Sequence, residues 1–278
     1  MKTTKRLMAM AFTACILLSV HICSAQDVTI PKEQNPQYKL NEQNVMGLVW
    51  MRSSGEYRAL CYQAYNAALR AVEDAVENAD CYSKPLAFVL DCDETILDGT
   101  AFNSTFVGTQ YSYSYAIFND WVRENRDVAI PGAVDLLNKI DELGVSIFYV
   151  SNRSEDIMEE SQKNLLSLGF PQVDSEHVLF FRKGDHKKIE RRAAINEKYH
   201  VIAYMGDSMT DFPLELEGKG SEESKHVADI HSDDFGTKFI ILPNPVYGSW
   251  ESALKPGYHK LTPEEKERVR KERLKKTV

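Results

Sequence analysis

The chain has 278 residues, 43% of them hydrophobic, which is enough for one sizeable α/β domain with an elaboration but argues against two large domains. Its formal net charge is −8. An acidic surface argues against nucleic acid as a partner, and any anion-binding site must be made locally positive by specific cations, backbone N–H groups or a metal.

The first 25 residues have the three parts of a secretory signal peptide: a basic start (Lys2, Lys5, Arg6), an apolar run from Leu7 to Val20, and the small-residue end Cys23-Ser24-Ala25. We expect cleavage after Ala25 and an exported protein, either periplasmic or associated with the outer membrane or cell surface. Cleavage removes three positive charges and no negative ones, so the net charge moves from −8 to −11. A retained anchor would need about 20 apolar residues. A lipid-modified Cys23, giving peripheral membrane attachment, stays an alternative.

Residues 26–43 are mostly polar and contain Pro31 and Pro36, which predicts a linker before a main domain at 44–260. From Ser54 to about Asn78, apolar residues recur at helical spacing and predict a long amphipathic helix. The last segment, 261–278, opens with a capping box at Thr262-Pro263-Glu264-Glu265 and predicts a charged helix.

The cysteines that remain after cleavage are Cys61, Cys81 and Cys92. An odd number leaves at least one free thiol. Cys61 and Cys81 lie at opposite ends of the predicted helix, about 30 Å apart at 1.5 Å rise per residue, which is beyond disulfide reach. We therefore expect no structural disulfide.

Five short, almost continuous apolar runs follow the long helix, and helical stretches separate them. Runs of this kind predict parallel strands buried on both faces, so the fold class is α/β with a doubly wound parallel sheet. A helix from Ala133 to Leu143 is predicted, with Pro131 at a first-turn position and Gly144 just past the end. The runs are Leu86–Leu90, Val145–Val150, Val178–Phe181, Val201–Met205 and Phe239–Leu242.

Polar side chains follow these strands at the edge where open parallel sheets bind ligands. The segments are Asp91-Cys92-Asp93-Glu94-Thr95, Ser151-Asn152-Arg153, the stretch from Arg182 to Lys188, Gly206 to Asp211, and Pro243 to Gly248. Carboxylates gathered at one edge repel one another unless a cation neutralises them, and Mg²⁺ prefers such oxygen ligands.

Residues alternate in direction along an extended strand, so Asp91 and Asp93 can face one site while Cys92 points into the core. Ser151 can donate a hydrogen bond to a phosphate, and a lysine of the 182–188 segment can oppose its charge. Four such segments, each after a successive strand, indicate a site for a metal ion and a phosphate much more strongly than a single segment does.

The sequence resembles the phosphohydrolases of the haloacid dehalogenase (HAD) superfamily, and more narrowly the class C acid phosphatases, which include bacterial surface lipoproteins acting as 5′-nucleotidases. The superfamily resemblance rests on Phe88–Thr95, Phe148–Arg153 and Gly206-Asp207. The narrower one rests on Glu56–Leu60, Pro131–Val134 and Leu242–Glu251. Together they extend from about Val45 to Leu254 and imply an exported Mg²⁺-dependent acid phosphatase acting on phosphate monoesters, with nucleoside 5′-monophosphates expected.

The resemblance also implies the roles of individual residues. Asp91 is the expected nucleophile and Asp93 the general acid and base, with Ser151 and Lys188 as the other catalytic groups, Lys187 being an alternative to Lys188. Asp91, Asp207, Asp211 and the backbone carbonyl of Asp93 are the expected metal ligands. Ser151, Asn152, Arg153 and Tyr247 are the expected substrate-binding residues, with Tyr247 stacked on the base.

The insertion at residues 99–130 contains several aromatic residues and, with the N-terminal helix, is expected to form a cap over the site. A non-catalytic surface or storage protein on the same scaffold is the alternative function, disfavoured because Asp91 and Asp93 are both present. A dehalogenase is weaker still, because that chemistry needs neither Asp93 nor magnesium. The preferred ester and the oligomeric state stay open.

Overall fold

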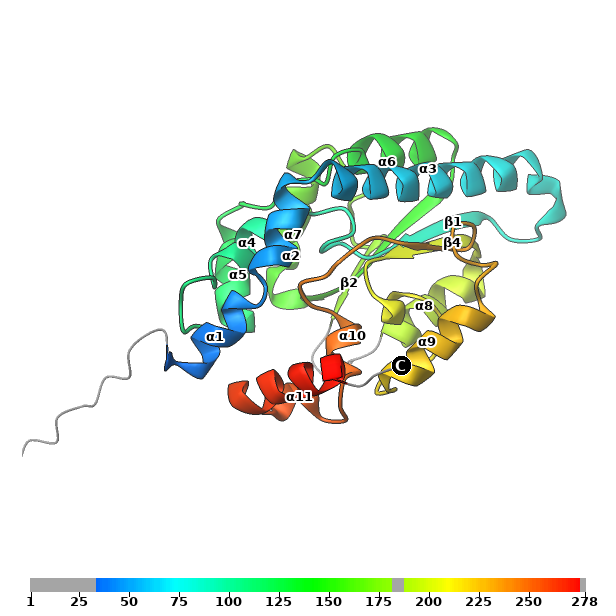
Figure 1. Cartoon of the computed structure of the whole chain (residues 1–278). Coiled ribbons are helices and arrows are strands. Elements are labelled where there is room, and N and C mark those ends of the chain that lie inside the picture. The colour runs from blue at the N-terminus through cyan, green and yellow to red at the C-terminus, as the bar shows by residue number, and fades with distance from the viewer. Residues whose placement is uncertain (1–33, 182–187, 276–278) are drawn as a thin grey trace, which may run out of the picture. The chain divides into compact units, whose positions relative to one another are not determined.

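A computed structural model of the chain describes residues 34–181 and 188–275. Within this part, a parallel sheet has the strand order β3-β2-β1-β4-β5 (Figure 1). The five predicted strands and the α/β fold class are therefore confirmed. The strands are β1 (Leu86–Leu90), β2 (Ser146–Ser154), β3 (Val178–Phe181), β4 (His200–Gly206) and β5 (Phe239–Ile241).

Helices cover both faces of the sheet, as burial of the strands on both sides requires. On one face lie α3 (Gly55–Glu77) and α6 (Ala133–Glu142), which Figure 1 shows above the strands. Buried residues of α3, such as Cys61, Ala68 and Val72, pack in one cluster with residues of β1, β2 and β4. On the other face, α8 (Lys188–Lys198) places Ile195 against β2 and β4. The remaining helices are α1 (Pro36–Glu42), α2 (Val45–Ser53), α4 (Thr100–Ser104), α5 (Tyr115–Arg123), α7 (Met158–Ser167), α9 (Ser221–Ile230), α10 (Ser249–Ser252) and α11 (Pro263–Lys275), with short 3-10 turns η2 (Ala79–Cys81), η3 (Glu155–Ile157), η4 (Met209–Asp211) and η5 (Tyr258–Lys260).

Two local predictions need correction. Pro131 precedes the N-cap of α6, which is Gly132 at φ 95°; a Cβ there would lie 2.8 Å from the Tyr62 ring, so this position needs glycine. Strand β2 extends to Ser154, because Ser154 pairs with Phe181 after a register shift. Ser151, Asn152 and Arg153 are thus the last part of the strand and not a loop after it.

The predicted linker is wrong over residues 36–42, which form α1. Asn35 caps this helix by accepting hydrogen bonds from the backbone N–H groups of Gln37 and Tyr38. Leu40 and Asn41 are buried, and the Asn41 amide donates to three backbone carbonyls of the insertion, including that of Phe106 at 3.1 Å. The polar sequence of this segment serves contacts with another part of the chain, which composition alone does not show. Residues 26–33 lie outside the described part of the chain.

The C-terminal helix α11 begins with the predicted capping box: the Glu265 N–H donates to Thr262 Oγ1 at 3.3 Å, and the Thr262 N–H donates to Glu265 Oε2 at 2.9 Å. Although charged, α11 is not merely a solvated helix. Val269 is buried, and Arg270 donates to the Tyr258 hydroxyl at 2.9 Å and to the Glu251 carboxylate.

The insertion returns to the domain close to where it leaves it. The Asp98 N–H donates to the Val128 carbonyl at 2.8 Å, and the Ile130 N–H donates to the Ile96 carbonyl at 2.9 Å. Its helices α4 and α5 pack around Phe102 and Trp121.

The predicted signal peptide and Cys23 lie outside the described residues. Among those described, no helix is long and apolar enough to span a membrane.

Candidate active site

Side chains predicted from the strand ends meet at one edge of the sheet. Carboxylate oxygens of Asp91, Asp207 and Asp211 lie within 4.8 Å of one another. Lys188, the first residue of α8, places its Nζ 2.7 Å from Asp91 Oδ1 and 2.7 Å from Asp211 Oδ1. Lys188 therefore contacts the expected nucleophile directly, whereas Lys187 lies in the segment 182–187, outside the described residues.

Burial perturbs the titration of this cluster. It raises the pKa of Asp91 to about 6, with Lys188 opposing the shift and the Asp211 charge adding to it. Burial raises the pKa of Asp207 well above its usual range, and the charges of Asp211 and Asp91 add to the effect. Lys188 therefore compensates only part of the negative charge of the three carboxylates.

The cluster suits a metal ion. All three donor groups are carboxylates, the ligand type that hard divalent cations take. Asp207 is held by hydrogen bonds from Asn244 Nδ2 at 2.9 Å and Thr95 Oγ1 at 3.4 Å. Asp211 Oδ2 accepts from the Ser208 N–H at 2.9 Å. These contacts orient the carboxylates toward a shared position, and Asp91, Asp207 and Asp211 would hold the ion there.

Asp93 lies outside this triad, and its side chain faces Arg153. Arg153 Nη2 is 2.7 Å from Asp93 Oδ1 and 2.6 Å from Asp127 Oδ2. The Arg153 side chain is 1% exposed. Arg153 is one of the residues that the sequence predicts to bind substrate, but its guanidinium is paired with the Asp93 and Asp127 carboxylates. Asp127 was not identified from the sequence, since no motif marks it.

The two residues before Arg153 differ in accessibility. Ser151 is buried, and its Oγ accepts from the Arg153 N–H at 3.1 Å, while its backbone carbonyl accepts from Arg191 Nη1 at 2.6 Å. The Ser151 hydroxyl hydrogen stays available to donate to a ligand. Asn152 is exposed, and both residues line the cavity described below.

Glu94 is a further buried carboxyl group at the site that sequence reasoning missed. It is 1% exposed, and burial, with the Asp207 charge adding, raises its pKa well above its usual range. The Tyr247 hydroxyl donates to Glu94 Oε2, and Asn103 Nδ2 donates to Oε1 at 3.4 Å. Only its place beside Asp93 in the sequence could have drawn attention to it, and that place does not reveal burial.

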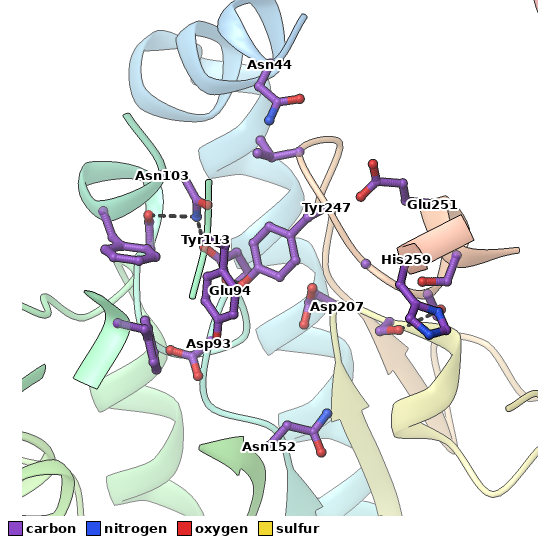
Figure 2. A pocket seen from close by; sticks show the side chains of 18 of the residues that line it. Asn44, Asp93, Glu94, Asn103, Tyr113, Asn152, Asp207, Tyr247, Glu251 and His259 are labelled. Atoms are coloured by element: carbon purple, nitrogen blue, oxygen red, sulfur yellow. Dashed lines mark hydrogen bonds between the residues drawn. The ribbon is translucent and has the colours of Figure 1, made fainter. Parts of the chain in front are cut away.

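A cavity of about 920 Å³ opens over these groups. Figure 2 shows Asp93, Asp207 and the rings of Tyr113 and Tyr247 around it. Its lining comes from the strand-end segments, the insertion, α1 and the C-terminal region. The predicted substrate residues Ser151, Asn152, Arg153 and Tyr247 all belong to this lining. One end of the cavity is therefore lined by carboxylates and Lys188, and another part is lined by the aromatic rings of Tyr113 and Tyr247.

Comparison with known proteins assigns the family. A model of the HAD superfamily, subfamily IIIB (Acid phosphatase), matches residues 8–250. Two solved structures of the class C acid phosphatase from Bacillus anthracis, one of them with tungstate bound, are similar to this chain. Each is 34% identical to it in sequence and superimposes with a TM-score of 0.81, and the match covers 86% of this chain and 100% of that chain. Acid phosphatase 1 of Solanum lycopersicum is 25% identical over 173 residues, and a Stem 31 kDa glycoprotein of Glycine max is 22% identical over 165 residues. The chain spans 58% of the length of each of these two relatives, and the matches cover 58% of this chain. The chain belongs to subfamily IIIB of the HAD superfamily, the acid phosphatases.

Proposed function

We propose that the protein is an exported, Mg²⁺-dependent phosphomonoesterase that works through a phosphoaspartyl intermediate on Asp91. The observation that carries this proposal is the position of the Asp91 carboxylate, 2.7 Å from Lys188 Nζ and beside the Asp207 and Asp211 carboxylates. The Bacillus anthracis relative has tungstate bound, an oxyanion that resembles phosphate in charge and shape. Acid phosphatase names among the relatives agree with this chemistry.

The reaction has two steps. In the first, a carboxylate oxygen of Asp91 attacks phosphorus, the bond from phosphorus to the leaving oxygen breaks, and Asp93 gives that oxygen a proton. In the second, water attacks the phosphoryl group, Asp93 takes a proton from it, and Asp91 is released as a carboxylate with inorganic phosphate. Lys188 and Ser151 bind the phosphoryl oxygens. Asp91, Asp207 and Asp211 would hold a Mg²⁺ ion, which would supply positive charge that offsets the charge of the phosphoryl group.

Nucleoside 5′-monophosphates are the proposed substrates. Tyr247 and Tyr113 lie beside the acidic end of the cavity, and an aromatic ring can stack on a nucleobase while the phosphate reaches Asp91 (Figure 2). In this arrangement the insertion acts as part of a cap and contributes to substrate choice.

The experiment is a panel of nucleoside monophosphates, sugar phosphates and aryl phosphates, assayed with Mg²⁺ and then with chelator. Hydrolysis should depend on Mg²⁺ and should be lost in Asp91→Asn, because an amide cannot attack phosphorus. A folded Asp91→Asn protein, free of contaminating phosphatase, that retains more than a small fraction of the wild-type rate would refute the proposal. Export is tested separately by mass spectrometry of the natively exported protein, which should begin at Gln26; a diacylglycerol adduct on Cys23 would contradict that cleavage site.

A further inference from the structure

The N–H groups of the Arg153 guanidinium are distributed between two carboxylates and a hydroxyl. Nε donates to Asp93 Oδ1 at 3.2 Å and to Asp93 Oδ2 at 3.1 Å, and Nη2 donates to Asp93 Oδ1 at 2.7 Å. The same Nη2 donates to Asp127 Oδ2 at 2.6 Å, and Nη1 donates to Ser161 Oγ at 3.2 Å. Arg153 thus binds the Asp93 carboxylate through Nε and Nη2, and the Asp127 carboxylate binds the same guanidinium through Nη2.

Asp127 is itself fixed. Its Oδ1 accepts from Trp121 Nε1 at 2.9 Å, and its backbone carbonyl accepts from Asn164 Nδ2 at 3.4 Å. Its side chain is 6% exposed. One carboxylate oxygen therefore binds the insertion helix α5, while the other binds Arg153 of β2.

The insertion is anchored on the segment that follows Asp93. Its returning segment, residues 128–130, is hydrogen-bonded to residues 96–98 and forms an isolated antiparallel bridge between Leu97 and Ala129. Because Asp127 immediately precedes this segment, its distance from Asp93 is set by a short, hydrogen-bonded stretch of backbone.

A role in stability alone does not explain the group. Replacing a buried ion pair by apolar residues of similar volume is often neutral or stabilising, so the cost of burying the Arg153 and Asp127 charges, beside an Asp93 side chain that is 23% exposed, needs another reason. The ring of Phe118, which lines the cavity, lies 5.3 Å from the guanidinium carbon, so the group also borders the space where a substrate would bind.

We infer that Asp127 is a positioning residue that acts through Arg153 to hold the Asp93 carboxylate in place for proton transfer. The inference rests on the proposed function, since it takes Asp93 as the general acid and base. Among the described residues, Asp93 Oδ1 takes the shorter Arg153 contact, at 2.7 Å, whereas Oδ2 accepts one bond, of 3.1 Å. Oδ2 is therefore the oxygen with room to carry the proton that moves to the leaving oxygen. The insertion therefore lines the cavity and also, through Asp127 and Arg153, fixes the position of the Asp93 carboxylate.

The test uses the dependence on the leaving group. An alkoxide leaves poorly unless it is protonated, whereas p-nitrophenolate leaves without a proton. Rapid-quench measurement of Asp91 phosphorylation compares glycerol phosphate with p-nitrophenyl phosphate in wild type and Asp127→Asn. The asparagine keeps the shape and the Trp121 acceptor, so the variant is expected to fold, but it loses the charged partner of Arg153 Nη2 and so no longer fixes the position of Arg153 and Asp93. A misplacement near 1 Å costs about 100-fold in rate, so phosphorylation by glycerol phosphate should fall by about that factor. Phosphorylation by p-nitrophenyl phosphate should stay within about threefold, since that step needs little general acid catalysis.

Two further variants complete the test. Arg153→Lys keeps the positive charge but cannot bind both carboxylates in one plane, so it should show the same leaving-group pattern, and it carries the test if Asp127→Asn does not fold. Asp120→Asn is the matched control: the same chemical change on α5, at a carboxylate that is 74% exposed, should leave both rates unchanged.

Equal losses on the two esters, or wild-type rates on both, would overturn the inference, because a merely structural role slows both reactions together. Asp91→Asn keeps this outcome distinct from failure of the proposed function. If wild type forms a phosphoenzyme that Asp91→Asn lacks, and Asp127→Asn matches wild type, only the positioning role fails. If Asp91→Asn still turns over p-nitrophenyl phosphate, the proposed function itself fails.

Discussion

The three carboxyl groups after β1 lie within four residues of one another, yet each has a different environment. Asp91 contacts Lys188, Asp93 is bound by Arg153, and Glu94 is buried and accepts a hydrogen bond from Tyr247. Glu94 has φ 52°, in the left-handed region, so the chain turns sharply immediately after Asp93. The turn directs adjacent carboxyl groups to separate partners.

The ring of Tyr247 is predicted to stack on the base of a bound nucleotide. Stacking on a base is worth about 1 to 3 kcal/mol, so Tyr247→Ala should raise KM for nucleoside monophosphates by about 5- to 150-fold. Tyr247→Phe keeps the ring and removes only the hydroxyl that binds Glu94, so it should retain most of this affinity. Steady-state kinetics of both variants on a nucleotide and on glycerol phosphate distinguish stacking on the base from a packing role of the ring. Equal losses on both substrates in Tyr247→Ala would make Tyr247 a packing residue.

Gly206, the last residue of β4, lies against Asp211. A Cβ at Gly206 would be 2.4 Å from the Asp211 Cβ, an atom too close to the backbone to swing away. Gly206→Ala should therefore displace the Asp211 carboxylate and raise the Mg²⁺ concentration for half-maximal activity by about 10-fold or more. Gly220→Ala is the control, because a Cβ there has no neighbour within 4 Å. Unchanged Mg²⁺ dependence in Gly206→Ala would exclude Asp211 from the metal site.

At the scale of elements, the strands and helices place the chemistry at one edge. Parallel pairing of β1 with β2 and β4 aligns Leu90 with Tyr149 and Met205, so the residues that follow them emerge together. Helix α3 covers the face of the sheet opposite α8, which carries Lys188. Close packing of α3 therefore buries one face of the sheet that carries the site.

Overpacking of α3 should destabilise the domain. Ala68 is fully buried in the cluster between α3 and the sheet, so Ala68→Leu should lower the free energy of unfolding by about 1 to 3 kcal/mol. Ala59 is exposed on the same helix, and Ala59→Leu should change the value by less than about 0.5 kcal/mol. Urea denaturation of both variants measures the difference. Equal effects would mean that α3 does not pack as described.

At the scale of the whole molecule, the acidic site links folding to pH and metal. A group whose pKa is higher in the folded than in the unfolded chain binds its proton more tightly when folded. It stabilises the fold below its unfolded pKa, and this contribution is lost as pH rises through the folded pKa. For Asp91 the window extends from 3.8 to about 6. Asp207 and Glu94 have raised pKa values too, so their contributions have the same sign.

Mg²⁺ should therefore stabilise the protein more at neutral than at acid pH. Without metal, the site's contribution to the free energy of unfolding falls from about pH 4 to pH 6. A cation that binds the ionised carboxylates offsets that loss, by about 2.7 kcal/mol at 100 times its Kd. Thermal unfolding with and without Mg²⁺ should show a larger rise in Tm at about pH 7 than at about pH 4.5. A rise of equal size in Asp207→Asn would place the ion elsewhere.

The sequence by itself determined the five strands, the long helix α3 and the candidate chemistry. Apolar runs and helical spacing report whether a segment is buried on two faces or one, and this is a local property. The bounds of β1 and β3 agree with the apolar runs, and α3 agrees with the spacing to within a residue. Alternation along the chain also placed Cys92 in the core behind Asp91 and Asp93, where it is fully buried.

Only the tertiary structure decided which polar groups meet. Arg153 bonds to Asp93 and Asp127, which are 60 and 26 residues away, and Tyr247 bonds to Glu94 across 153 residues. Helix α1 likewise depends on contacts of Asn41 with carbonyls 65 to 70 residues away. Such partners have no spacing that a local pattern can encode, because the distance between them is set by how the insertion returns to the sheet and by how parallel strands align their ends.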